Sequence, residues 1–142
     1  MRRLLAVAVV LMCFGGALVS LGIPDALAAD PHVAIIDIDD AISPSTSRFL
    51  SRAIDSAADS DAVLLLVRLD TPGGLLDATR DMVDAITNAQ VPVVVYVAPT
   101  GAHAASAGTF ITAAAHVAAM APITNIGAAT PIAVGDELPE TL

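Results

Sequence analysis

The segment Gly101-Ala-His-Ala-Ala-Ser-Ala-Gly-Thr-Phe110 decides the fold of this chain. The run before it, Val91-Pro-Val-Val-Val-Tyr-Val-Ala98, is β-branched and uninterrupted, which predicts a buried parallel strand. The residues after it, Thr109–His116, predict a closely packed helix. A serine between small residues, where a strand turns into a helix, is the arrangement of an activated nucleophile. The unpaired N–H groups of the first helical turn favour negative charge at Ser106 or beside it. The alternative interpretation is that Ser106 only caps the helix.

A second strand and turn lie upstream of this segment. Ala62-Val-Leu-Leu-Leu-Val-Arg-Leu-Asp70 predicts a buried strand, and Thr71-Pro-Gly-Gly74 follows at its carboxyl end, where open α/β sheets place their sites. Two adjacent glycines can turn their N–H groups toward one point, as in an oxyanion hole. Alone, Pro-Gly-Gly is an ordinary turn. Because Ser106 follows the next strand, we expect the donors and the nucleophile to face each other across neighbouring strand ends.

Strands and helices alternate along the rest of the chain. His32–Asp39 predicts a first strand, and apolar residues then recur at helical spacing from Phe49 to Ala57, after Pro44, which suits a first helical turn. Leu75–Ala89 predicts a second amphipathic helix. This order predicts one α/β domain, residues 30–142, with a mostly parallel sheet and right-handed crossovers.

The amino-terminal residues have the three parts of a secretory signal. Met1-Arg-Arg3 is basic, the run from Leu4 to Gly22 is apolar and uncharged, and Ala26-x-Ala28 offers a cleavage site. We therefore expect residues 1–28 to be a signal peptide. An uncleaved membrane anchor stays open, because the apolar run approaches spanning length. Either interpretation places the domain outside the cytoplasm.

Composition excludes several kinds of partner and cofactor. The formal net charge is −9, with 15 acidic residues and no lysine, so the chain would repel a phosphate backbone and we expect no nucleic-acid partner. The single cysteine, Cys13, lies in the apolar amino-terminal segment. The three histidines lack ligand spacing, and Asp37, Asp39 and Asp40 fit a solvated strand end better than a metal site. We expect no metal and no cofactor.

Four motifs stand in order along the chain: Leu69-Asp-Thr-Pro-Gly-Gly-Leu75, Val91-Pro-Val-Val-Val-Tyr-Val-Ala-Pro99, Ala104-Ala-Ser-Ala-Gly-Thr109, and Met120-Ala-Pro with Thr124-Asn-Ile-Gly-Ala128. With these motifs, residues 32–142 resemble NfeD-type membrane serine proteases, which belong to the ClpP/crotonase-like superfamily. The resemblance implies a ClpP/crotonase-like fold and a Ser-Lys endopeptidase on the extracytoplasmic side of the bacterial cell membrane. It also implies hydrophobic segments of stomatin-like membrane proteins as substrate, and homo-oligomers, which are usual in the superfamily.

Four residues of this chain match functional positions of the family. Ser106 matches the nucleophile. By analogy with ClpP, the N–H groups of Gly74 and Ala107 would line the oxyanion hole, and Gly73 would permit the turn.

The general base is missing from this pattern. The family supplies a lysine beyond the serine, and this sequence contains none. Asp136–Leu142 predicts the beginning of a helix, so we expect the 142 residues to be a fragment that ends before the base. His103, three residues before Ser106, is the alternative base. We expect His32 and His116 to be structural and Asp70 to shape its turn.

Three functions from different classes compete. The first is an exported, membrane-associated serine endopeptidase with a hydrophobic substrate cleft. The second is a non-catalytic protease-fold module that binds a membrane protein partner, motivated by the absence of lysine. The third is a crotonase-type acyl-CoA enzyme. The export signal disfavours the third, because coenzyme A is cytoplasmic.

Overall fold

A computed structural model describes residues 30–130 of the chain. The predicted signal peptide (1–28) and the predicted start of a helix at Asp136–Leu142 lie outside the described residues. Within residues 30–130, every helix is too short or too polar to cross a membrane.

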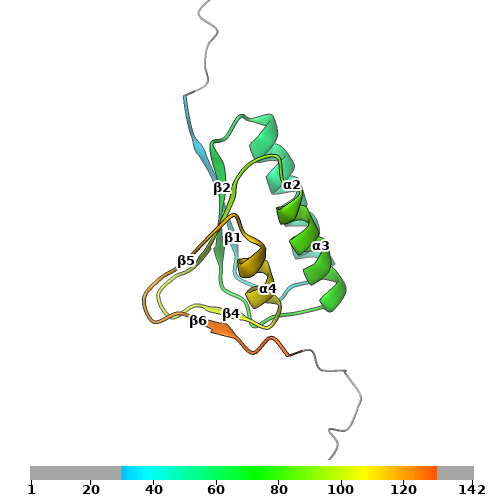
Figure 1. Cartoon of the computed structure of the whole chain (residues 1–142), viewed down its shortest axis with the longest axis vertical. Helices are drawn as coiled ribbons and strands as arrows, with labels where there is room; N and C mark the ends of the chain where they lie inside the picture. Colours follow the sequence, from blue (N-terminus) through cyan, green and yellow to red (C-terminus); the bar gives the residue numbers. More distant parts are fainter. Residues whose placement is uncertain (1–29, 131–142) are drawn as a thin grey trace, which may run out of the picture. The chain divides into compact units, whose positions relative to one another are not determined.

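The main sheet has four parallel strands in the order β1-β2-β3-β5: Val33–Ile38, Leu64–Leu69, Val93–Val97 and Val117–Met120. The prediction of a parallel α/β sheet is therefore confirmed. Leu69 of β2 lies opposite Val97 of β3, so the two strands end side by side. The Pro-Gly-Gly turn and the serine segment both start from this edge of the sheet, at the lower end in Figure 1.

Two short strands, β4 (His103–Ala105) and β6 (Asn125–Gly127), form a second parallel sheet near the carboxyl ends of the main strands (Figure 1). Neither strand was predicted from the sequence. Three residues are too few for an alternation pattern, and β4 forms because it has partners on both sides. Thr71 exchanges backbone hydrogen bonds with β4 on one side, donating to His103 (2.6 Å) and accepting from Ala105 (3.1 Å).

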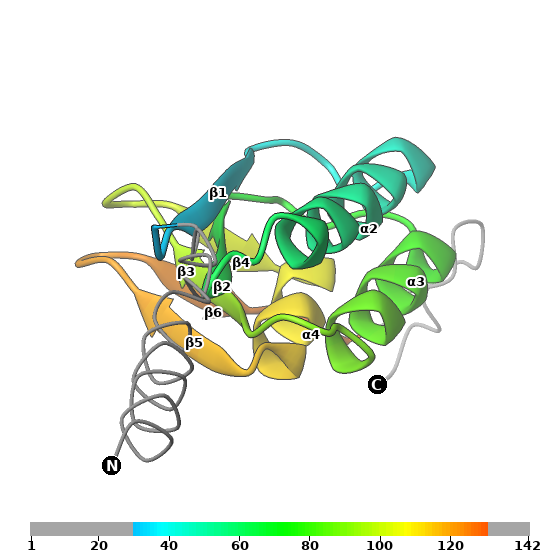
Figure 2. The same ribbon diagram turned by 90° about the horizontal axis from the view of Figure 1, so that it is seen from above.

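Three helices, α2 (Pro44–Asp59), α3 (Leu76–Thr87) and α4 (Ala107–Ala114), cover one face of the main sheet (Figures 1 and 2). The predicted start of α2 is confirmed, because Ser43 caps it and forms a reciprocal capping box with Thr46.

The prediction of helix α4 as Thr109–His116 was two residues too late at both ends. α4 begins at Ala107 and ends at Ala114, so His116 lies beyond the helix and cannot stabilise its carboxyl end. Instead, the backbone N–H of Val93 donates to Nδ1 of His116 (3.2 Å), which joins α4 to the start of β3.

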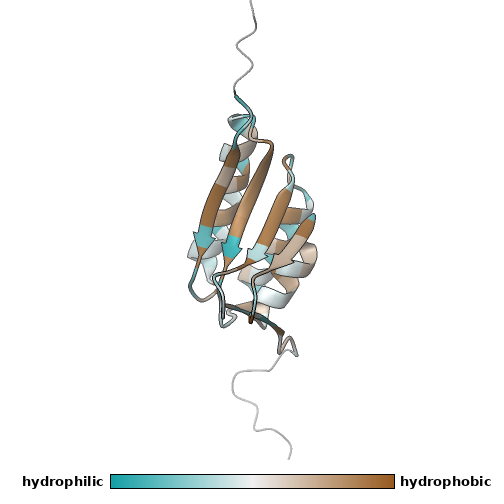
Figure 3. Cartoon of the chain, turned by 90° about the vertical axis from the view of Figure 1, so that its left-hand side faces the viewer, coloured by the Kyte–Doolittle hydropathy of each residue, from teal (hydrophilic) through white to brown (hydrophobic). Residues whose placement is uncertain are grey.

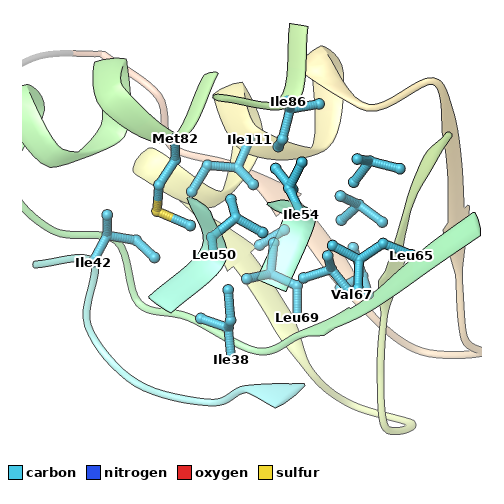
Figure 4. Packing of buried hydrophobic residues seen from close by; sticks show 14 of the residues in the cluster. Ile38, Ile42, Leu50, Ile54, Leu65, Val67, Leu69, Met82, Ile86 and Ile111 are labelled. Atoms are coloured by element: carbon cyan, nitrogen blue, oxygen red, sulfur yellow. The ribbon is translucent and has the colours of Figure 1, made fainter. Parts of the chain in front are cut away.

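The hydrophobic core lies between the sheet and the helices (Figure 4). Alternate residues of β2 and β3 point into it, because successive side chains of a strand face opposite sides of a sheet. The helices contribute the other half of the core. Its largest buried side chains are Ile42, Leu50, Leu65, Leu69, Met82, Ile86 and Ile111.

The opposite face of the main sheet is not covered by any helix of the described residues (Figure 3). The residues of the strands are mostly apolar, with hydrophilic residues near the carboxyl ends of β1 and β2. Ile35 on this face is 56% exposed. Near the carboxyl ends of β1 and β2, Arg68 pairs with Asp37 through two contacts of 2.6 and 2.7 Å. The hydrogen bond and the charge of Asp37 raise the pKa of Arg68 above its ordinary value.

We expect Ile38→Ala to lower the free energy of unfolding by about 2–5 kcal/mol, because it leaves a cavity in the core. Ile38 is 3% exposed, whereas Ile35 on the same strand is 56% exposed. Ile35→Ala removes the same atoms from the same kind of backbone and should cost about 1 kcal/mol or less. Urea unfolding of both variants measures the difference, and equal losses would contradict this account of the core.

Candidate active site

Ser106 stands at the junction of β4 and α4 in a strained backbone conformation. Its φ is 50° and its ψ is −108°, a region that residues with a side chain rarely adopt. Its backbone N–H donates to the carbonyl of Gly127 in β6 (2.8 Å), which holds this conformation. A strained serine at a sharp strand-to-helix turn is the geometry of a nucleophile elbow.

The hydroxyl of Ser106 does not cap the helix that follows. Ser106 occupies the N-cap position of α4, yet its side chain makes no capping hydrogen bond. The side chain is half-buried rather than enclosed. The alternative interpretation, that Ser106 serves only as a cap, therefore loses its physical basis.

The Pro-Gly-Gly turn lies directly against Ser106. A Cβ on Gly73 would sit 2.7 Å from Cβ and 3.2 Å from Oγ of Ser106, closer than two such carbons approach in proteins. Gly73 also has a φ of 113°, which disfavours any other residue. The sequence thus brings the predicted turn and the predicted nucleophile into contact.

The orientation of the peptide between Gly73 and Gly74 follows from its hydrogen bond. The carbonyl of Gly73 accepts from the N–H of Ile42 (2.8 Å). In a planar trans peptide the next N–H points the opposite way, so the N–H of Gly74 points away from Ile42. Ser106 lies against Gly73, the residue before this N–H group.

Two backbone N–H groups remain available beside Ser106. The N–H groups of Gly74 and Ala107 have no acceptor among residues 30–130, and Ala107 is the first residue of α4, where the helix leaves its N–H groups unpaired. The N–H of Gly73 instead donates to Oγ1 of Thr71 (3.2 Å), so Gly73 shapes the turn and does not offer a donor.

Close packing fixes the start of α4 against the turn. A Cβ on Gly108 would lie 2.7 Å from Cγ2 of Thr71, so only glycine fits there without a shift. The hydroxyl of Thr109 donates to the carbonyls of Ala104 (3.1 Å) and Gly127 (2.9 Å). These contacts explain why small residues surround Ser106.

The three histidines have different surroundings. His116 and His32 make structural contacts, His116 with the start of β3 and His32 with Oγ of Ser60 (3.3 Å). The backbone N–H of His103 donates to Oδ1 of Asp70 (2.9 Å), so Asp70 holds the start of β4. The exposed His103 lines a cleft with β6, and no hydrogen bond in the described part of the chain joins its imidazole to Ser106.

The aspartates near the end of β1 are engaged in local contacts. Asp37 pairs with Arg68, and Oδ1 of Asp40 accepts from the N–H of Ala41 (2.7 Å). Over residues 30–130, no group of three or more His, Cys, Asp or Glu side chains could hold a metal ion.

Two residues that shape the site were not singled out from the sequence. Thr71 is fully buried and hydrogen bonds to the turn, and Gly127 accepts from Ser106. Both lie inside the motifs that carry the family resemblance. That position was the only signal available, because Gly127 and Ser106 are distant in sequence, and so are Thr71 and Asp40, whose carbonyl accepts from the Thr71 hydroxyl.

The geometry defines a class of protein. A strained serine at a strand-to-helix elbow, in contact with the glycine turn that follows β2, is typical of acyl-transfer enzymes that use a serine nucleophile. The fold is ClpP/crotonase-like. The chain belongs to the family described as NfeD1b, N-terminal domain, whose model matches residues 32–138.

Two curated relatives are membrane proteins. Over 132 residues the chain is 38% identical to the membrane-bound protease PH1510 of Pyrococcus horikoshii, which covers 93% of this chain and 28% of that protein. Over 105 residues it is 35% identical to the membrane protein NfeD1b of Bacillus subtilis, covering 74% of this chain and 23% of that protein. The chain thus spans about a quarter of the length of these relatives.

Solved structures agree with this assignment. A lysine-to-alanine variant of 1510-N, a membrane-bound stomatin-specific protease, in complex with a substrate peptide, has a TM-score of 0.72 and 42% identity, covering 73% of this chain and 48% of that chain. A serine-to-alanine variant of the same protease has a TM-score of 0.73 and 39% identity, covering 80% and 54%.

More distant structures show the fold alone. ClpP1 from Listeria monocytogenes has a TM-score of 0.58 at 21% identity, covering 66% of this chain and 55% of that chain. The β subunit of a P. aeruginosa geranyl-CoA carboxylase has a TM-score of 0.56 at 18% identity, covering 66% and 20%.

We expect Gly73→Ala to destabilise the domain more than Gly101→Ala. Both glycines have positive φ, at 113° and 87°, so both variants should lose about 1–2 kcal/mol to backbone strain. Only Gly73 lies against Ser106, whereas a Cβ on Gly101 would have nothing within 4 Å. The clash should cost Gly73→Ala about 1–3 kcal/mol more. Equal midpoints in urea unfolding would show that the turn does not press on Ser106.

Proposed function

We propose that this chain is the protease domain of an exported, membrane-associated serine endopeptidase with Ser106 as its nucleophile. The observation that carries the proposal is the elbow conformation of Ser106 (φ 50°) against a glycine turn, with the N–H groups of Gly74 and Ala107 beside it. Its relatives include a membrane-bound protease, which supports the same activity.

In the proposed reaction, Oγ of Ser106 attacks the carbonyl carbon of a peptide bond while a base takes its proton. The N–H groups of Gly74 and Ala107 hydrogen bond to the oxyanion of the tetrahedral intermediate, a kind of stabilisation worth several kcal/mol. The C–N bond then breaks, and the amine leaves with a proton from the protonated base. Water hydrolyses the acyl-enzyme by the same steps.

The proposed base is a lysine beyond Leu142. Support comes from the 1510-N protease, of which a serine variant and a lysine variant were made at positions roughly forty residues apart. The same distance counted from Ser106 passes Leu142, the last residue of this sequence. A lysine in an apolar pocket loses its charge readily and can act as a base.

The proposed substrate is a hydrophobic segment of a stomatin-like membrane protein. The 1510-N protease is described as specific for a stomatin homologue. Around the site of this chain, Leu75, Leu76 and Phe110 are 59%, 49% and 43% exposed, an apolar surface that suits such a segment. We further propose that the domain lies on the extracytoplasmic side of the bacterial cell membrane, on the basis of the signal-like amino-terminal sequence, and that it forms a homo-oligomer, as is usual in the superfamily.

A second candidate is a non-catalytic protease-fold module that binds a membrane protein partner. It is favoured by the absence of lysine from this sequence and by the absence, in the described part of the chain, of a side chain hydrogen bonded to Oγ of Ser106.

The first test is cleavage of a Leu/Val-rich peptide by a protein that extends past Leu142 to include the proposed lysine. We expect Ser106→Ala to lower the rate by about 1,000-fold or more, because it removes the nucleophile. Ser56→Ala is the matched control, since Ser56 is exposed on α2, and it should cleave normally. A charged peptide of equal length should be cleaved more slowly.

The outcomes separate the two candidates. Cleavage that survives Ser106→Ala would overturn the assignment of the nucleophile. Binding of the apolar peptide without cleavage, equal in the wild-type protein and in Ser106→Ala, would identify the chain as a binding module.

A further inference from the structure

Thr71 is a fully buried polar residue that the proposed reaction does not use. It lies between the end of β2 and the glycine turn, and its backbone is paired with β4. Among the side chains of residues 30–130, Thr71 alone hydrogen bonds to Gly73 or Gly74. A buried hydroxyl with several partners on one turn calls for an explanation beyond packing.

The hydroxyl of Thr71 joins the turn to the loop after β1. The hydroxyl can donate one hydrogen bond, and the nearer acceptor is the carbonyl of Asp40 (2.8 Å). The carbonyl of Gly73 is farther from Oγ1 (3.3 Å). Oγ1 in turn accepts from the N–H of Gly73 (3.2 Å). The same loop carries Ile42, whose N–H holds the carbonyl of Gly73 (2.8 Å).

These bonds hold the turn from two sides. The hydroxyl of Thr71 accepts from the N–H of Gly73, and the N–H of Ile42 donates to the carbonyl of Gly73. Because the peptide between Gly73 and Gly74 is planar, these two bonds also fix the direction of the N–H of Gly74. The methyl group of Thr71 meanwhile sets how close α4 can approach, through its contact with Gly108. Thr71 therefore touches both halves of the site, the donor turn and the nucleophile helix.

We propose that Thr71 is a positioning residue whose hydroxyl aims the N–H of Gly74 at the oxyanion beside Ser106. The proposal rests on the proposed function, because it assigns Thr71 a part in the same reaction. It acts through Gly73 and does not touch the substrate.

The test compares two ligands that share an apolar peptide sequence. One ends in a boronic acid, and Oγ of Ser106 bonds to its boron while the hydroxyl proton passes to solvent and a boronate oxygen takes negative charge. The other ends in a carboxamide and forms no bond. Only the affinity for the boronate should depend on the oxyanion donors. The ratio of the two affinities therefore measures how well the N–H groups are oriented toward the oxyanion.

We expect Thr71→Val, which keeps the shape and removes the hydroxyl, to lose at least tenfold in boronate affinity and less than threefold in carboxamide affinity. Thr71→Ser, which keeps the hydroxyl, should stay within threefold of wild type for both. Thr112→Val is the matched control, because Thr112 is also buried and its hydroxyl bonds only to Gly108 within α4 (2.7 Å). It should leave the ratio unchanged.

Unchanged boronate affinity in Thr71→Val would overturn the proposal, and so would an equal loss for both ligands, which indicates a purely structural role. If Thr71→Val does not fold, Thr71→Cys replaces it, since a thiol hydrogen bonds weakly and should give a smaller loss of the same kind.

Amide hydrogen exchange separates this proposal from the proposed function. If wild type binds the boronate no better than Ser106→Ala, the proposed function fails. Faster exchange at Gly73 in Thr71→Val than in Thr71→Ser would still show that the hydroxyl holds the turn. Equal exchange in the two variants would overturn the positioning role.

Discussion

No side chain fits between the Pro-Gly-Gly turn and Ser106, and the arrangement of the site depends on this exclusion. Gly73 touches Ser106, and Gly108 touches Thr71, each at a distance that a Cβ would violate. The parallel pairing of β2 with β3 delivers both segments to the same edge of the sheet. The glycines then let the turn and the start of α4 approach each other closely.

The sequence predicted the layers of the fold well, because their signals are local. The apolar runs of β2 and β3 and the helical spacing from Phe49 to Ala57 depend on burial alone. The strands β4 and β6 could not be predicted, since each has three residues and exists through pairing with distant segments. The position of His116 was wrong for a related reason: its partner, Val93, is 23 residues away.

In the candidate site, too, local sequence patterns could be recognised and contacts between distant segments could not. Ser106 and the glycine turn were singled out because each lies in a recognisable sequence pattern, and the structure brings them into contact. The roles of Gly74 and Ala107 came from the analogy with ClpP and stay predictions. The sequence could not show which backbone N–H groups of the turn are already hydrogen bonded. The N–H of Gly73 donates to the hydroxyl of Thr71, and the position of that hydroxyl follows from three-dimensional packing. Thr71 itself looked like part of an ordinary turn. What distinguishes it is complete burial, together with partners before β2, in the turn and in β4.

The strained backbone conformation of Ser106 lowers the stability of the folded domain. Glycine adopts a φ of 50° without penalty, so a glycine at this position would relieve strain of about 1–3 kcal/mol and make the domain more stable, but without the serine hydroxyl. A chain drifting under selection for stability alone would lose its serine by this route. The folded domain therefore carries a standing cost at a single residue, which the hydrogen bond to Gly127 and the packing of α4 must offset.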